Sequence, residues 1–111
     1  MPYTAGFRDI IDLREHYAEH GSDFGVPTEQ EYLNQADAFL GGPRASDTLD
    51  CRRRCKDGSF GDYVRFNMVT HEFGVLSADN VIRTYYVPDP MRHRQVNNLA
   101  YFQAECRKVI C

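Results

Sequence analysis

The sequence predicts an α+β domain: two N-terminal helices packed on a four-stranded antiparallel meander sheet, with a C-terminal helix. Three observations lead to this prediction. Apolar residues recur with a helical period over residues 7–40, alternate with a period of two over much of 49–87, and return to helical spacing near the end. The alternating runs are separated by short turns, which join antiparallel strands. The length of 111 residues suits one modest core, so residues 1–111 are expected to form a single domain.

The two N-terminal helices are predicted from periodicity and from their end signals. The first covers residues 7–20, and Gly21 follows as a stop signal. The second covers residues 28–40, where Thr28 and Glu31 form a capping box before an apolar stripe. A Gly-Gly-Pro sequence then ends this helix. The inner stripe of the second helix is expected to contain Tyr32, Leu33, Ala36, Phe39 and Leu40.

Four strands are expected next, at residues 49–56, 62–70, 73–77 and 81–87. The first of them contains CRRRC, which has no apolar alternation, so its prediction has the least support. The sequence Pro-Asp-Pro after the fourth strand ends the sheet, because proline cannot donate to a strand ladder.

The last expected helix covers residues 97–109, with Leu99, Phe102 and Cys106 turned inward. The chain contains no apolar run of the roughly eighteen residues that a membrane-spanning helix needs. Its N-terminus lacks a basic start followed by an apolar block, so no signal peptide is expected.

The charge of the chain is uneven. Thirteen basic and sixteen acidic residues give a net charge of −3, which does not indicate nucleic-acid binding by bulk charge. Two local clusters are basic, however, and a local basic surface can bind phosphate on an acidic chain. These clusters are Arg52, Arg53, Arg54 with Lys56, and Arg92, His93 with Arg94.

Four cysteines occur as two pairs in the sequence, Cys51 with Cys55 and Cys106 with Cys111. Free thiols, one or two disulfides, and a zinc site are all compatible with this pattern. Neither pair has the C-x2-C spacing of a zinc knuckle. The sequence leaves these alternatives open.

The stretch H-Y-A-E-H at residues 16–20 puts two histidines on one face of a helix. It matches the H-x-x-E-H pattern of a zinc hydrolase, which also needs a third protein ligand. A second interpretation is structural, since a histidine near a helix C-terminus is favoured by the helix dipole. A third is proton transfer, because histidine titrates in the useful range and serves as acid or base.

A ribonuclease without a metal needs a base for the 2′-hydroxyl, an acid for the leaving 5′-oxygen and a cation near the phosphate. Arginine provides a fixed fork that fits phosphate. The strands offer Arg65 and Arg83 for this role, with Thr84 beside Arg83. If the first helix packs across the sheet, His16 and His20 can face Arg83 or Thr84.

Several stretches, taken together, resemble one known group of proteins. They are EHYAEHGSDFG, EYLNQADAFL, GDYVRFNMVTHEFGVLSADNVIRTYYVPDP and a later YF. In order and spacing they resemble the C-terminal toxin domains of bacterial polymorphic toxin systems. These are ribonucleases grouped with barnase, EndoU, colicin D and RelE, abbreviated BECR. The resemblance runs from about His16 to Phe102, and its most specific part is the strand region.

The resemblance implies a toxin endoribonuclease that cleaves RNA by metal-independent 2′-hydroxyl attack, with no cofactor and no metal. By position, His20 and His16 take the catalytic roles of the helix, and Arg83 and Thr84 those of the strand. Tyr86 and Arg65 are then the substrate-binding candidates. Relatives commonly carry lysine where this chain has Glu19, a departure that removes a cation near the histidines.

The partners implied are RNA, with tRNA as one candidate, and a cognate immunity protein; a monomer without membrane contact is expected. The expected place of action is the cytoplasm of a target bacterium, after delivery by a larger toxin or a secretion system. Two alternatives remain. One is a catalytically inactive RNA- or protein-binding module of the same fold, and the other is a zinc hydrolase that uses the HxxEH motif.

Overall fold

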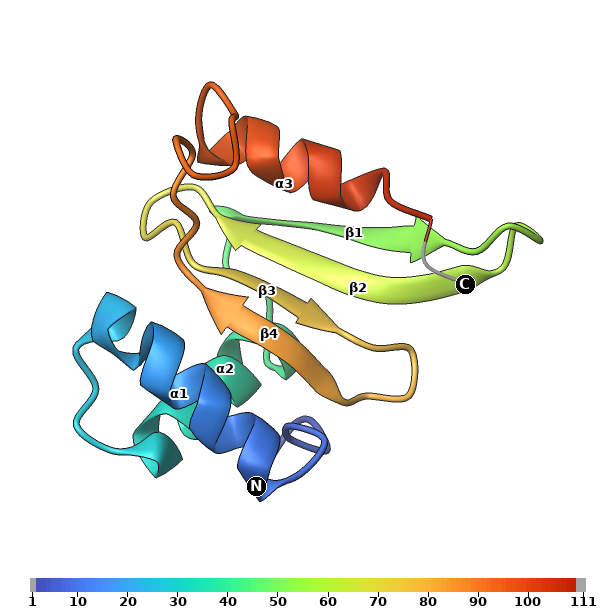
Figure 1. Cartoon of the computed structure of the whole chain (residues 1–111). Helices are drawn as coiled ribbons and strands as arrows, with labels where there is room; N and C mark the ends of the chain where they lie inside the picture. The colour runs from blue at the N-terminus through green and yellow to red at the C-terminus, as the bar shows by residue number, and fades with distance from the viewer. Residues whose placement is uncertain (1, 110–111) are drawn as a thin grey trace.

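The computed structural model describes residues 2–109 of the chain. The four strands pair antiparallel in the order β1-β2-β3-β4 (Figure 1). Two helices precede the strands in the chain and one helix follows them. The predicted α+β meander is therefore confirmed. The elements are α1 (Ile10–Phe24), α2 (Glu29–Gly41), β1 (Thr48–Arg54), β2 (Phe60–Asn67), β3 (Phe73–Leu76), β4 (Ile82–Tyr86) and α3 (Asn98–Cys106).

Helices cover both faces of the sheet (Figure 1). Helices α1 and α2 pack on β3 and β4, whereas α3 packs on β1 and β2 from the opposite face. Because strand side chains alternate between faces, the sheet contributes to two separate cores. The core under α1 and α2 contains Phe7, Leu13, Tyr32, Ala36, Leu40, Leu76, Ile82 and Tyr85. The core under α3 contains Val64, Phe66, Phe73, Val75, Tyr101 and Phe102.

The predicted end of the first helix at Gly21 is wrong, because α1 continues for another turn to Phe24. Gly21 is buried against the ring of Tyr17, and a Cβ there would lie only 2.6 Å from a ring carbon. Its small size serves close packing inside the helix. Gly25 ends the helix instead, with a left-handed backbone at φ 63°. His20 therefore does not stand at the helix C-terminus, which removes the observation behind the dipole interpretation.

The N-terminal segment lies along the outer edge of β4. The Ile82 amide donates to the Gly6 carbonyl at 2.8 Å, and the Ala5 amide donates to the Asn80 carbonyl at 2.9 Å. Phe7 forms a parallel bridge with Ile82. These bonds occupy part of an edge that would otherwise be unpaired. They also bring the start of α1 beside β4.

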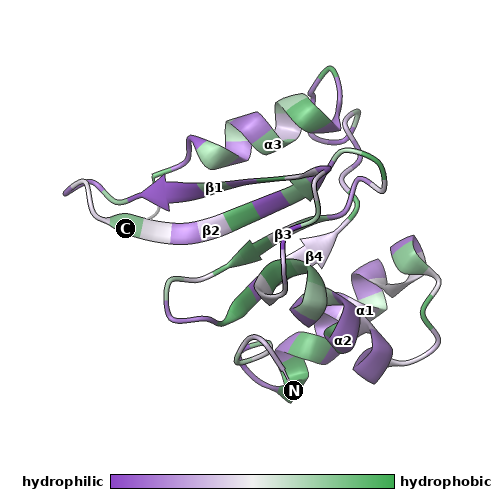
Figure 2. Cartoon of the chain, turned by 180° about the vertical axis from the view of Figure 1, so that it is seen from behind, coloured by the Kyte–Doolittle hydropathy of each residue, from purple (hydrophilic) through white to green (hydrophobic). Residues whose placement is uncertain are grey.

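Strand β1 forms although its sequence is polar, and it is hydrophilic toward its C-terminal end in Figure 2. Arg53 is turned inward and is only 6% exposed. Its neighbours point the other way, where Arg52 lies over the rings of Phe60 and Tyr63 at 4.7 and 4.2 Å. The strand is therefore held by charged and cation–π contacts in place of an apolar stripe.

A disulfide joins Cys51 on β1 to Cys106 on α3, across a sequence separation of 55 residues. The bond crosses between the two sequence pairs and ties the last helix to the sheet. No free cysteine occurs among residues 2–109. Cys111, which belonged to the second sequence pair, lies outside these residues. Within the same range, no helix is both long and apolar enough to cross a membrane.

Candidate functional site

Helix α1 positions both candidate histidines beside the sheet. The rings of His16 and His20 are 6.1 Å apart, as expected one turn from each other. The His20 ring stacks on that of Tyr86 at 4.8 Å and 23°. Tyr86 belongs to β4, so the packing of α1 against this strand fixes the place of His20.

His20 and Tyr86 share a hollow of about 350 Å³ between α1 and the segment that follows β4. We call it the His20 hollow. Its walls carry two imidazoles and one guanidinium together with three carboxylates, so it is a polar site that can exchange protons. The lining residues are Glu19, His20, Asp23, Tyr86, Val87, Asp89, Arg92 and His93.

A group of aromatic rings supports this hollow. The hydroxyl groups of Tyr86 and Tyr101 are hydrogen-bonded to each other. The His93 ring lies 4.3 Å from that of Tyr101 and 6.5 Å from that of Tyr86. Burial raises the pKa of Tyr86 far above its ordinary value of 10.0, so its hydroxyl stays protonated. Tyr86, predicted as a substrate-binding candidate, is thus a packing surface for His20.

The environment of His20 favours its neutral form. Burial lowers the pKa of His20 below 6.5, and Arg92 and His16 lower it further, against the opposing effect of Glu19 and Asp23. The two carboxylates lie 3.8 Å from the two ring nitrogens. A neutral imidazole near a guanidinium can accept a proton from a bound hydroxyl group.

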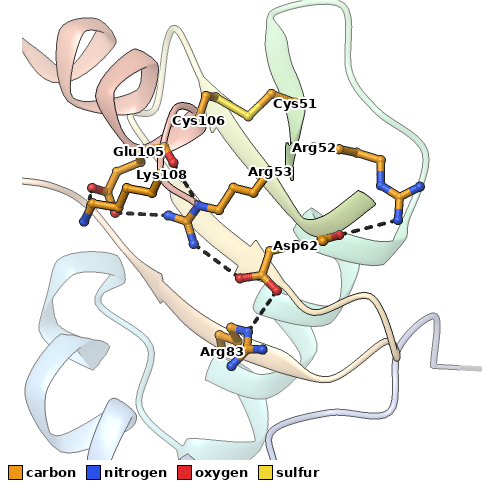
Figure 3. A network of polar contacts seen from close by, with 9 residues as sticks. Cys51, Arg52, Arg53, Asp62, Arg83, Glu105, Cys106 and Lys108 are labelled. Carbon is orange, nitrogen blue, oxygen red and sulfur yellow. Dashed lines mark hydrogen bonds and ion pairs between the residues drawn. A yellow bond between two sulfur atoms is a disulfide. The ribbon is translucent and has the colours of Figure 1, made fainter. Parts of the chain in front are cut away.

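Arg83 lines a second hollow of about 310 Å³, with Arg8, Asp12 and Asp79 among its walls. Its Nε donates to Asp62 Oδ1 at 3.0 Å, although 57% of the Arg83 side chain is exposed. Asp62 is 3% exposed and also binds the buried Arg53 (Figure 3). A buried carboxylate thus orients Arg83, and its guanidinium remains accessible to an anion.

Of the other predicted residues, His16 lies between the two hollows without lining either. Its Nε2 is 3.5 Å from Asp12, which belongs to the second hollow. Its Nδ1 is buried and has no hydrogen-bond partner within the described chain. Thr84 is half-buried and pairs with Val75, so it faces the same side of the sheet as Tyr86.

Arg65 stands apart from the other candidates. Its Nη1 donates to the carbonyls of Phe39 and Gly42, at 3.0 and 2.8 Å, and so satisfies the C-terminal end of α2. It aligns with Gly74 and Tyr85, which puts it on the sheet face opposite Tyr86. The geometry gives Arg65 a structural role.

Four further residues shape the site, of which Asp62 and Tyr101 were not expected from the sequence and Arg92 and His93 were expected only as part of a basic cluster. Asp62 orients Arg83, Tyr101 supports Tyr86, and His93 and Arg92 line the His20 hollow. The one available signal was the basic stretch Arg92-His93-Arg94, which comes directly after the strand that carries Tyr86.

No protein-family model and no curated protein matches this chain. Among residues 2–109, no group of three or more His, Cys, Asp or Glu side chains is arranged to hold a metal ion.

Proposed function

We propose that this chain is a toxin endoribonuclease that cleaves RNA by attack of a 2′-hydroxyl on the adjacent phosphate, without a metal. The observation that carries the proposal is the His20 hollow, in which an imidazole held in its neutral form faces a site with a guanidinium, that of Arg92. The resemblance to BECR toxin domains supports the same chemistry.

In this reaction His20 accepts the proton of the 2′-hydroxyl as its oxygen bonds to phosphorus. The bond from phosphorus to the 5′-oxygen then breaks, and that oxygen takes up a proton. The products are a 2′,3′-cyclic phosphate and a free 5′-hydroxyl. Arg92 offsets the negative charge that gathers on the phosphate oxygens, and Arg83, which lines the second hollow, binds a neighbouring phosphate of the same strand. Thr84, beside Arg83 in β4, lines neither hollow, so the scheme gives its hydroxyl no direct contact with the scissile phosphate.

The proposal includes a cognate immunity protein and delivery into a target bacterium. An inhibitor that covers the site needs carboxylates opposite Arg83 and Arg92, since complementary charge steers such complexes. The same surface would meet RNA phosphates, so inhibitor and substrate would compete.

The second candidate is an inactive RNA- or protein-binding module of the same fold. It is favoured by Glu19, whose Oε2 lies 3.8 Å from His20 Nε2. In the position where relatives commonly carry a cation, this carboxylate repels phosphate from the imidazole.

The two candidates are separated by incubating the purified chain with total RNA and with tRNA in EDTA. We expect fragments that end in 2′,3′-cyclic phosphate, and His20→Gln should lower the rate by about 10²- to 10⁴-fold.

His71→Asn serves as the matched control. His71 lies outside both hollows, and asparagine tolerates its left-handed backbone at φ 64°. RNA that stays intact with wild-type chain at high concentration would exclude the nuclease and leave the binding module.

A further inference from the structure

The reaction needs a second proton-transfer group, which protonates the leaving 5′-oxygen. His16 is the sequence candidate for it, but this ring contributes no atom to the lining of the His20 hollow. It packs against Phe7 at 5.1 Å, and its Nδ1 is buried without a partner in the described chain. His16 is therefore poorly placed to reach a substrate atom that His20 also reaches.

His93 stands on the other wall of the same hollow. It comes from the segment between β4 and α3, and Tyr86 contacts both rings, that of His20 at 4.8 Å and that of His93 at 6.5 Å. The imidazoles of His20 and His93 both pack on Tyr86 and line one hollow, and Arg92, from the same segment as His93, contributes its cation.

The position of His93 is built into the fold. Its amide donates to the Asp89 carbonyl at 3.2 Å, and the Gln95 amide donates to the Pro90 carbonyl at 2.8 Å, which close the turn around it. Its ring rests at 4.3 Å on Tyr101 of α3, and Tyr101 is itself only 6% exposed. The turn at residues 89–95 and the ring of Tyr101 in α3 thus hold the imidazole in place.

We propose that His93, and not His16, is the second catalytic histidine, which donates the proton to the leaving 5′-oxygen while His20 accepts the proton of the 2′-hydroxyl. This inference rests on the proposed ribonuclease activity and deepens it by naming the acid and base.

The assignment of roles follows from the charges around the hollow. Burial and Arg92 favour the neutral form of His20, which suits a base. The acid must then be the other imidazole of the hollow, that of His93. The hydroxyl groups of Tyr86 and Tyr101 are hydrogen-bonded to each other and do not take this role. The charged and titratable groups that face the pair are Glu19, Asp23 and His16 on α1, Asp89 and Arg92 on the loop, Tyr86 on β4 and Tyr101 on α3.

The test compares two substrates that differ in their need for an acid. One is RNA, whose alkoxide leaving group needs a proton. The other is a set of the four ribonucleoside 3′-(4-nitrophenyl phosphates), whose leaving group departs without one. We expect His93→Gln to slow RNA cleavage by about 100-fold or more, and to slow nitrophenol release far less. His20→Gln should slow both reactions.

The pH profile of RNA cleavage provides a second readout. Wild-type kcat/KM should rise and then fall with pH, because it needs one neutral and one protonated imidazole. His93→Gln should lose the alkaline fall and keep the acid rise. His93→Asn, with folding checked by circular dichroism, repeats the test with a smaller side chain.

The inference is overturned if His93→Gln leaves RNA cleavage unchanged, or slows both substrates alike, or if the selective loss belongs to His16→Gln. In each of these outcomes the wild type still cleaves RNA, so the proposed function survives. If the wild-type chain cleaves no RNA, both the proposed function and the catalytic role of His93 are overturned.

Discussion

Asp62 shows how one buried carboxylate serves both stability and the candidate site. It binds Arg53, which is buried with it, and Arg83, which is mostly exposed. The Arg53 guanidinium also reaches Glu105 of α3, at 3.2 Å to Oε1 (Figure 3). A buried charge is tolerated only when it is paired and hydrogen-bonded, so these side chains depend on one another.

We predict that Asp62→Asn lowers the free energy of unfolding by about 3 kcal/mol, because it leaves Arg53 with a single carboxylate partner in a buried site. Asp50→Asn is the matched control. It breaks an ion pair with Arg44 that is about half exposed, 46% for Asp50, and should cost less than about 1 kcal/mol. Urea unfolding followed by circular dichroism measures both, and equal effects of the two substitutions would contradict the coupled role of Asp62.

At the scale of elements, the helix and strand periods predicted the architecture but not all the ends. The first helix was expected to stop at Gly21, because glycine is a common stop signal, but here the glycine leaves room for the ring of Tyr17 one turn earlier in the same helix. Strand β1 was expected despite its arginines, and what holds Arg53 inside is a carboxylate from another strand. A partner on another strand leaves no period in the local sequence.

The same reason limits what the sequence predicted of the site. His20 and Tyr86 are brought together, as their roles in the sequence analysis required. Arg83 and His20 line different hollows, since the bulge in β4 between Ile82 and Thr84 directs Arg83 toward Asp62. The face that a strand residue presents depends on register, and a bulge changes it.

The Cys51–Cys106 disulfide is a covalent link between the sheet and α3, the helix that carries Tyr101. We predict that Cys51→Ala with Cys106→Ala lowers the free energy of unfolding by about 2–4 kcal/mol, since a cross-link limits the unfolded chain. Amide hydrogen exchange should show that α3 loses more protection than α2, which has no covalent link to the sheet. Unchanged protection in α3 would mean that its core contacts alone hold it.

For the whole molecule, charge is distributed so that an acidic chain can still present cations locally. The net charge is −3, and the walls of the His20 hollow hold three carboxylates beside Arg92. Arg83 in the second hollow is offset by Asp62. An RNA strand would therefore meet few cations at the proposed site, and most of its phosphates would remain in solvent with their counterions.

This distribution predicts a weak dependence of RNA binding on salt. Each phosphate that a single strand gives to a cation changes the slope of log Kobs against log[salt] by about −0.7. Two contacts, with Arg83 and Arg92, give a slope of about −1.4. Fluorescence anisotropy of a labelled single-stranded RNA, titrated with the inactive His20→Gln chain at several salt concentrations, measures this slope.

Arg83→Gln and Arg92→Gln should each make the slope shallower by about 0.7, because each removes one phosphate contact. Arg14→Gln is the matched control, since Arg14 is exposed on α1, pairs with Glu29 and lines neither hollow. A steep slope that neither substitution changes would show that RNA binds elsewhere, with the arginines of β1 as the next surface to test. If each single substitution removed the salt dependence completely, the two hollows would bind one RNA strand jointly.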